Sequence, residues 1–470
     1  MLLERIYDED LAQASYFVGC QAKGEAIVID PRRDLTPYLD LAARHGMRIV
    51  AVTETHIHAD YLSGTRELAA ATGATAYVSA EGGDDWQYGF EAERLHHGDA
   101  ITLGNIVVEA RHTPGTPPST SPSWSPTARS PTTRATSSPA TSCSSATSAA
   151  RTSWTRLPEA VNTRFAGARQ LFESLRRDFL TLPDYVQVFP AHGAGSACGR
   201  ALGAIASTTV SYERENAWWA PFLRDGNEEG FVAALLDGQP DAHAYFARMK
   251  RQNKLGPALM GEPDRLVEFD NVTLAERLAA DEVIFVDTRH NSQVHTGTVA
   301  RSLNVPGIGK AASYGAWVFD PEREYRPLVL LAGDETVARE YRDHLVRVGI
   351  DNVIGYTTSL AGLPLVVPAV IGQDDLDTTG RAMLLDVRNK TEFAAGHLPG
   401  AEQLSGGRVL WQLDQLPTGG APIIAYCQSG VRVSVASSAL RRAGYDVVEL
   451  EGSYLGWLTH QGQKKAISVG

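Results

Sequence analysis

Two short segments of this chain carry side chains that can do chemistry. The first reads THIHAD (residues 55–60) and follows an apolar run. Histidines two positions apart on an extended segment project to the same side, and His56 and His58 are followed by Asp60 as the chain turns. A later apolar run ends in the same way at His192. These four residues are the candidate ligands of a metal site.

The second segment is CQSGVR (residues 427–432), between an apolar run and an amphipathic pattern. A strand-to-helix loop that contains Gly430 can turn its backbone N–H groups inward as an anion-binding nest. The helix N-terminus and Arg432 add positive potential, which favours the thiolate form of Cys427. Cys427 is therefore a candidate nucleophile, and a buried structural cysteine is the alternative.

Alternating short strands and helices must position the metal segment. Residues 47–54 predict a buried strand that ends at THIHAD, and residues 35–46 an amphipathic helix that stops at Gly46. A hairpin is expected around Gly104–Asn105, and a helix over residues 165–183.

An internal repeat must position the thiol. Residues 327–341 and 422–436 superpose at an offset of 95, and each copy predicts a small doubly wound parallel sheet. In the first copy Ala332 stands in place of Cys427, and Val337 in place of Arg432. This copy cannot carry sulfur covalently, and we expect it to be a spacer or docking domain.

The chain's bulk properties set its class. Its 470 residues suggest three domains, which we place at 1–255, 265–365 and 370–468. A net charge of −12 argues against a nucleic-acid surface, and the N-terminus has no export or membrane signal. Four scattered cysteines do not form a disulfide framework, so we expect a cytoplasmic protein, with self-association left open.

The thiol segment and its upstream text resemble the rhodanese sulfurtransferases. The shared residues are those of the loop together with Asp386, Arg388, Glu392, His397 and Pro399. The resemblance implies that Cys427 accepts a sulfane sulfur as a persulfide, with Arg432, Asp386 and Arg388 as further site residues. The Cys-x5-Arg phosphatases are the functional rival, but their loop is one residue longer.

The metal segment, RHTPG (111–115) and His192 resemble the metallo-β-lactamase fold, an αββα sandwich. With the tandem repeat, the whole chain resembles the bacterial persulfide dioxygenase–rhodanese fusions. This implies one Fe(II) per chain and oxidation of a low-molecular-weight thiol persulfide by O2 to sulfite. The rhodanese end would connect persulfide and sulfite through thiosulfate.

A forty-residue stretch, 116–155, interrupts this resemblance. It holds no Ile, Leu, Val, Phe, Tyr, Gly, Asp, Glu or Lys, and 28 of its residues are Ser, Thr or Pro. The resemblance implies that His56 is the first iron ligand. It places the second on a histidine at position 116, where this chain has Thr116. It places the third on an Asp about twenty-five residues later, but no acid lies between Glu109 and Glu159. As printed, two of the three iron ligands are therefore missing, and tight iron binding is not expected.

A translation frameshift explains the stretch better than a disordered linker does. Read one base earlier, codons compatible with residues 116–119 can encode His-Thr-Pro-Glu. Codons compatible with residues 140–153 can encode Gly-Asp-Phe-Val-Phe-Val-Gly-Asp-Val-Gly-Arg-Pro-Asp-Leu. Both match the sequence pattern of the family that the chain resembles. We therefore predict that residues 116–159 are translated out of frame between two compensating changes.

Two other functions stay open. A thioester hydrolase of the glyoxalase II type would use two metal ions, with zinc as the alternative metal, but Tyr61 stands where that family has a histidine ligand. A sulfur-carrier or docking protein would have an inert metal domain. His112, on the strand before the anomalous stretch, is a poor substitute ligand because it lies four residues early.

Overall fold

The computed structural model describes residues 1–83, 86–115, 121–129, 134–140, 159–193, 196, 205–237, 242–376, 382–417 and 421–469. Thr116 and residues 141–158, where the missing iron ligands were expected, lie outside this set. Two compact units divide the chain, one formed by residues 1–242 and 246–261 and the other by 243–245 and 262–470. The second unit contains both copies of the repeat. No helix in the described part of the chain is long and apolar enough to cross a membrane.

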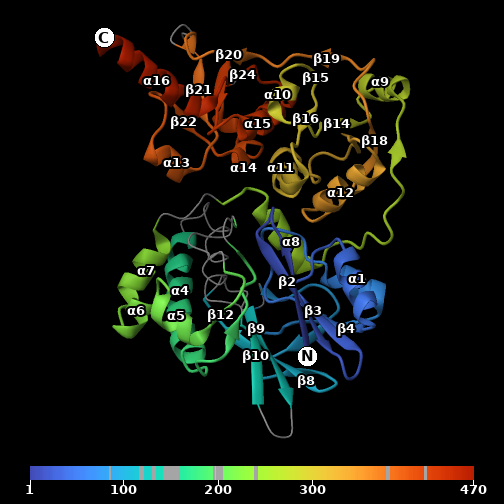
Figure 1. Ribbon diagram of the computed structural model, residues 1–470, viewed down its shortest axis with the longest axis vertical. Coiled ribbons are helices and arrows are strands. Elements are labelled where there is room, and N and C mark those ends of the chain that lie inside the picture. Colours follow the sequence, from blue (N-terminus) through green and yellow to red (C-terminus); the bar gives the residue numbers. More distant parts are fainter. Residues whose placement is uncertain are drawn as a thin grey trace. The chain divides into compact units, whose positions relative to one another are not determined.

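The first unit is built on two six-stranded sheets (Figure 1). One sheet has its strands in chain order: β1 (Leu2–Asp8), β2 (Gln13–Cys20), β3 (Glu25–Ile29), β4 (Arg48–Thr53), β5 (Thr75–Ser79) and β6 (Glu93–Leu95). The other also follows chain order: β7 (Ala100–Leu103), β8 (Ile106–Thr113), β9 (Ser121–Arg129), β10 (Arg134–Ala140), β11 (Gln187–Val188) and β12 (Thr208–Thr209). The predicted hairpin is confirmed, since β7 pairs antiparallel with β8 across Gly104, whose φ is 54°.

Helices cover both outer faces of this pair of sheets. Against the first sheet lie α1 (Thr36–His45) and α2 (Thr65–Thr72), which share an apolar core with Phe17, Val28 and Val52. Against the second lie α4 (Glu159–Ser174), the π-helical turn η2 (Leu175–Phe179), α5 (Val210–Asn216), α6 (Ala220–Arg224) and α7 (Glu228–Leu236). A third cluster, including Val18, Ile27 and Val108, fills the space between the sheets. The predicted αββα sandwich is confirmed, and α1 ends as expected at Gly46, with φ 60°.

The second unit contains two sheets of the same design (Figure 1). The first copy has strand order β13-β18-β17-β14-β16. Its elements are β13 (Val267–Glu268), α9 (Asn271–Ala279), β14 (Ile284–Asp287), α10 (Asn291–Val294), β15 (Thr298–Val299), β16 (Leu303–Asn304), η3 (Ile308–Lys310), α11 (Ala311–Val318), β17 (Leu328–Leu331), α12 (Glu335–Val346), β18 (Val353–Thr357) and β19 (Leu365–Val366).

The second copy has the corresponding order β20-β24-β23-β21-β22. Its elements are β20 (Val370–Ile371), β21 (Met383–Asp386), α13 (Lys390–Ala395), β22 (Glu402–Gln403), α14 (Gly406–Val409), η5 (Leu413–Gln415), β23 (Ile423–Tyr426), α15 (Val431–Arg442), β24 (Val447–Leu450) and α16 (Ser453–Val469). All of its strand pairs are parallel, which confirms the doubly wound fold predicted from the repeat.

Polar contacts join the two copies. The backbone N–H of Asn304 donates to Ser438 Oγ at 2.9 Å, and Ser434 Oγ donates to Asn304 Oδ1 at 2.8 Å. At the rim, Glu324 of the first copy accepts hydrogen bonds from its neighbour Arg326 and, at 3.3 Å, from Arg442 of α15. The hydrogen bonds from Arg326 lower the pKa of Glu324 to about 2.

This depressed pKa predicts how acid acts on the second unit. A carboxyl group whose pKa is lower in the folded state stabilises that state above its ordinary pKa of 4.5, and the contribution is lost as the pH falls toward 2. We therefore expect Glu324→Gln to lower the melting temperature at pH 7, with a gap to the wild type that narrows as the pH falls from 4.5 to 2. Thermal melts of both proteins across this range measure the gap. A gap that does not change with pH would contradict the assignment.

Candidate functional site

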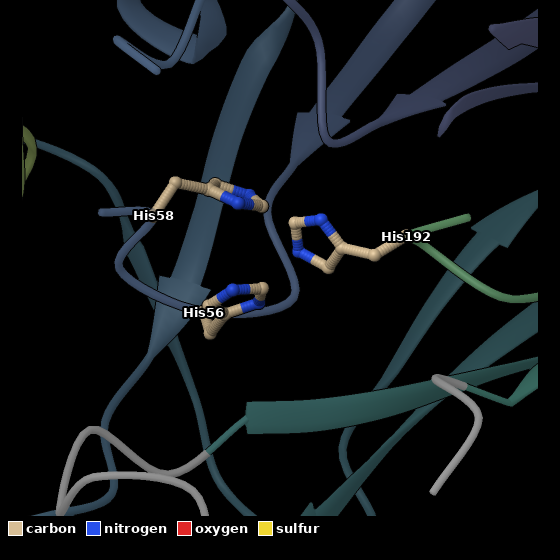
Figure 2. Close-up of side chains that lie close together, drawn as sticks. All are labelled: His56, His58 and His192. Carbon is tan, nitrogen blue, oxygen red and sulfur yellow. The ribbon is translucent and has the colours of Figure 1, made fainter. Parts of the chain in front are cut away.

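The metal segment lies at the C-terminal end of β4, where the chain leaves the first sheet and turns toward α2. Neighbouring strands β3 and β4 run parallel with Ile29 beside Thr53, so their ends meet at one edge of the sheet. His192 follows β11 and arrives from the second sheet. All three histidine side chains are buried, and Figure 2 shows their rings facing one common space.

The three rings form a compact group. His56, His58 and His192 each offer one nitrogen such that these atoms lie within 4.8 Å of one another. Ring centroids are 4.1 Å apart for His56 and His58, and 5.8 Å for His56 and His192. Asp60 Oδ2 lies 3.5 Å from His192 Nδ1, at the side of this group. The structure thus brings together the four residues that the sequence singled out as candidate ligands.

Asp30 orients the segment and was missed by the sequence analysis. It follows β3 and accepts hydrogen bonds from the Thr55 N–H at 2.6 Å, from Thr55 Oγ1 at 2.8 Å and from His58 Nε2 at 3.0 Å. Its φ of 55° is a left-handed conformation that an aspartate tolerates only at a cost in free energy. The signal available in the sequence was a carboxylate directly after an apolar strand beside the metal strand.

Charges and burial set the protonation of the three rings. Burial lowers the pKa of His56 well below its ordinary value, and it also lowers the pKa of His192. Burial acts in the same direction on His58, but the carboxylate of Asp30 outweighs it and raises the pKa of His58. His56 and His192 are therefore neutral at pH 7, the form in which imidazole binds a metal ion.

Orphaned polar atoms show that this group fits a metal ion. Among the described residues, His58 Nδ1, both ring nitrogens of His192 and both carboxylate oxygens of Asp60 are buried without a hydrogen-bond partner. Such atoms are costly to bury unless something binds them. Imidazole nitrogens and a carboxylate are the ligand types that suit zinc and iron. The site is therefore compatible with a metal.

Helix α8 (Phe246–Leu255) holds the backbone of the metal segment through hydrogen bonds. Asn253 Nδ2 donates to the backbone carbonyls of His58 at 2.8 Å and Tyr61 at 2.7 Å, and its Oδ1 accepts the N–H of Ser63 at 2.9 Å. One turn earlier, the ammonium of Lys250 lies 3.9 Å above the ring of Trp86. Burial lowers the pKa of Lys250 to about 7.

His112 lies apart from the histidine group, whereas the ring of Tyr61 packs beside it, with its centroid 4.4 Å from that of His58. His112 is on β8, where its backbone N–H donates to His97 Nδ1 at 3.1 Å, and it does not belong to the group. Tyr61 is buried, and its hydroxyl donates to the backbone carbonyl of Asp30 at 3.2 Å.

The thiol lies in the loop between β23 and α15. Cys427 is buried, and its Sγ accepts the backbone N–H of Gly430 at 3.1 Å. Gly430 has a φ of 115°, and a Cβ at this position would lie 2.7 Å from Asn291 Nδ2 of the first copy. This backbone conformation favours glycine, and in it the loop directs one backbone N–H, that of Gly430, at the thiol sulfur.

Arg432 is held beside the loop rather than pointing freely into it. It donates two hydrogen bonds to the Glu392 carboxylate, at 2.7 and 2.8 Å. Glu392 also closes a capping box with Asn389 at the start of α13. The bonds from Arg432 lower the pKa of Glu392.

Asp386 and Arg388 form a buried ion pair beneath the loop. Arg388 Nη2 donates to Asp386 Oδ2 at 2.7 Å and to the carbonyl of Gly396 at 2.7 Å, while its Nη1 donates to Gln428 Oε1 at 3.1 Å. The first copy repeats the pair, since Arg289 Nη2 lies 2.7 Å from Asp287 Oδ2.

Because the copy without a thiol has the same pair, the pair belongs to the scaffold of the fold. Arg289 also donates to the carbonyl of Gly297 at 2.7 Å, as Arg388 does to Gly396. The bond to Gln428 has no counterpart in the first copy, where Gly333 occupies the corresponding position.

The first copy closes its loop with its own carboxylate. Ala332 stands in the place of the thiol, and Asp334 Oδ1 accepts the N–H of Val337 at 2.9 Å. The positions of Glu392 and Arg432 are occupied by Gln293 and Val337. The thiol and the Arg432–Glu392 ion pair beside it therefore occur in the second copy and not in the first.

Removal of Asp386 is expected to destabilise the second unit strongly. Asp386→Ala leaves the charge of Arg388 buried without a partner, which costs about 3–5 kcal/mol. Asp287→Ala is the matched control, because the side chain of Arg289 is 23% exposed and water can solvate it, against 2% for Arg388. Urea unfolding of both variants measures the difference. No loss of stability for Asp386→Ala would contradict the scaffold role, and equal losses for the two variants would contradict the effect assigned to the burial of Arg388.

Comparisons with known proteins identify both units. The family model described as Metallo-beta-lactamase superfamily matches residues 8–129, and that of the Rhodanese-like domain matches 373–460. A crystal structure described as a metallo-beta-lactamase from Staphylococcus aureus subsp. aureus COL is 30% identical with a TM-score of 0.63, and the match covers 76% of this chain and 98% of that one. This chain belongs to the metallo-β-lactamase superfamily.

Within that superfamily it joins a metallo-β-lactamase domain to a C-terminal rhodanese-like domain. Persulfide dioxygenase ETHE1 of Bos taurus is 28% identical over 126 residues, which are 25% of this chain and 45% of that protein. The probable adenylyltransferase/sulfurtransferase MoeZ of Mycobacterium tuberculosis is 33% identical over 169 residues, 34% of this chain and 41% of that protein. This metallo-β-lactamase superfamily protein thus spans less than half of the length of these curated relatives.

Proposed function

We propose that this protein is a sulfurtransferase of sulfur metabolism, with Cys427 as the sulfur carrier. The observation that carries the proposal is the contact between Cys427 Sγ and the N–H of Gly430, inside a loop whose special residues the first copy lacks. The relatives named as sulfurtransferase and persulfide dioxygenase support the same class of chemistry. Thiosulfate, sulfite and low-molecular-weight persulfides are the proposed substrates.

The transfer proceeds by displacement at sulfur. The Cys427 thiolate attacks the outer sulfur of thiosulfate, the S–S bond of thiosulfate breaks, and sulfite leaves with the electron pair. A thiolate acceptor, or cyanide, then attacks the terminal sulfur of the persulfide, and the electron pair returns to Cys427. Throughout, the N–H of Gly430 stabilises negative charge on sulfur. Arg388 positions the loop through Gln428, and Arg432 contributes positive potential.

For the metal domain we propose descent from a persulfide dioxygenase with one iron per chain. The family pattern assigns His56 as the iron ligand that this chain retains, and His58, His192 and Asp60 lie beside it. When bound, iron supplies activation of O2. Asp30 orients His58, and Asn253 holds the backbone of the segment. The similarity to a protein named persulfide dioxygenase favours iron over zinc, because activation of O2 needs a redox-active metal and zinc is not one.

We further propose that this iron site is incomplete in the printed chain. The superfamily match ends at residue 129, inside the anomalous stretch. The two family ligands that the sequence lacks belong at Thr116 and about twenty-five residues later. An out-of-frame translation of 116–159 accounts for both absences, and the nucleotide sequence of the gene tests it.

Two measurements separate this proposal from its rivals. In a chain with residues 116–159 restored to the alternate frame, a hydrolase would bind two metal ions and a persulfide dioxygenase one. A docking protein would transfer no sulfur. Tyr61 argues against the hydrolase, since its hydroxyl is already bound to the Asp30 carbonyl. The assay for the sulfurtransferase is transfer of sulfur from thiosulfate to cyanide, and transfer that survives loss of the Cys427 thiol would refute the proposal.

A further inference from the structure

We propose that Ser453 is a second catalytic side chain of the thiol site, whose hydroxyl donates a hydrogen bond to the sulfur of Cys427. The proposal rests on the proposed function of Cys427 and adds a residue outside the cysteine loop. Ser453 is the first residue of α16, which begins after a two-residue turn that follows β24. Its chemistry is that of a buried proton donor aimed at an anionic sulfur.

The contacts of Ser453 place its hydroxyl between the backbone N–H and the thiol sulfur of Cys427. The backbone N–H of Cys427 donates to Ser453 Oγ at 3.3 Å, and Ser453 Oγ donates to Cys427 Sγ at 3.9 Å. The next residue, Tyr454, donates its N–H to the carbonyl of Cys427 at 3.0 Å. A hydroxyl has one proton and two lone pairs, so it can accept the first bond and donate the second at the same time.

The backbone of Ser453 indicates that a side chain is needed here. Its φ is 53°, a left-handed conformation that favours glycine, and its side chain is completely buried. Strained conformations of this kind persist where the surrounding structure enforces them, and they cluster at functional sites. Glycine would remove the strain but also the only atom of this residue that reaches the sulfur.

The first copy provides the contrast. At the offset of 95 the residue corresponding to Ser453 is Thr358, which is exposed, and the residue corresponding to Cys427 is Ala332. The buried hydroxyl thus occurs in the copy that has a thiol. Together with the N–H of Gly430 it gives the thiolate two donors.

In sulfur transfer this second donor acts when negative charge lies on Sγ. It stabilises the thiolate before attack on thiosulfate. It does so again when the acceptor takes the terminal sulfur, as the S–S bond breaks and the electron pair returns to Sγ. The proton stays on the serine oxygen, and no oxidant or reductant is needed. Loss of the hydroxyl therefore slows both steps and makes the thiol harder to ionise.

The test is the pH dependence of Cys427 alkylation by iodoacetamide in the full-length chain, followed by peptide mass spectrometry. Ser453→Gly removes the hydroxyl and relieves the backbone, so this variant is expected to fold. We expect its alkylation midpoint to rise by about one pH unit and its sulfur transfer to fall about tenfold. Thr358→Gly is the matched control in the first copy and leaves both unchanged.

The role of Ser453 and the proposed function of Cys427 are contradicted by different results. A midpoint and a transfer rate equal to those of the wild type in Ser453→Gly would overturn the role of Ser453. Absence of sulfur transfer in the wild type would overturn the proposed function of Cys427, because alkylation does not depend on transfer.

Discussion

Replacement of Cys427 by serine is expected to reduce sulfur transfer from thiosulfate to cyanide by about a thousandfold or more. A serine hydroxyl stays protonated at neutral pH and is a poor nucleophile toward sulfur, and it cannot form a persulfide. The donor geometry of the loop, with the N–H of Gly430 directed at position 427, cannot compensate for the missing sulfur. Steady-state kinetics at pH 7 measure the effect.

A second buried thiol provides the control for this substitution. Cys20 lies on β2 of the first unit, where its Sγ accepts the N–H of Asn105 at 3.4 Å. Cys20→Ser should therefore retain full transfer activity. Circular dichroism should show that both variants are folded. Transfer that persists in Cys427→Ser, or that disappears in Cys20→Ser, would remove Cys427 from the role of carrier.

Rewriting residues 116–159 in the alternate frame is expected to have the second large effect. The printed chain offers His56, His58 and His192 for a metal but lacks the two ligands that the family places in this stretch. We expect the purified protein with the sequence as given to hold well under one iron per chain. The rewritten protein, in which residues 116–159 come from the alternate frame, should hold about one. Persulfide-dependent O2 consumption should rise by at least about a hundredfold. Loss of a residue that only hydrogen-bonds to a metal ligand already lowers activity about 10–100-fold, and two ligands themselves are restored here.

His56→Ala in the rewritten chain is the control for this experiment. It removes the ligand that both versions share, so iron and O2 consumption should fall again. Elemental analysis and an oxygen electrode give the two readouts. A printed protein that already holds one iron and consumes O2 at the rewritten protein's rate would contradict the proposal of an incomplete site.

Local patterns predicted most of the fold. Gly46 and Gly104 marked a helix end and a hairpin in the sequence because both positions have a positive φ, which few residues other than glycine adopt readily. The offset of 95 revealed the two sheets of the second unit because each copy repeats its whole apolar pattern. The histidine group was predictable because each ligand follows an apolar strand, but the sequence did not show that the two strands, β4 and β11, belong to different sheets.

The residues that support the sites were not predictable in the same way. Asn253 accepts a hydrogen bond from Ser63 of the metal segment, although the two residues are 190 positions apart in the sequence. A local sequence pattern cannot predict such a contact. Ser453 has no signal in the sequence, and Asp30 has only its place after an apolar strand. Their hydrogen bonds to Cys427 and His58 become visible only in the folded chain. The roles of Asp386 and Arg388 became clear from the same ion pair in the copy without a thiol.

The most direct test of the central claim is to look for the sulfur on Cys427. The full-length protein is incubated with thiosulfate, and its peptides are analysed by mass spectrometry before and after addition of cyanide. We predict that the peptide containing Cys427 gains the mass of one sulfur atom and that cyanide removes it. A peptide of unchanged mass, or added sulfur on Cys20 instead, would contradict the assignment of Cys427 as the sulfur carrier.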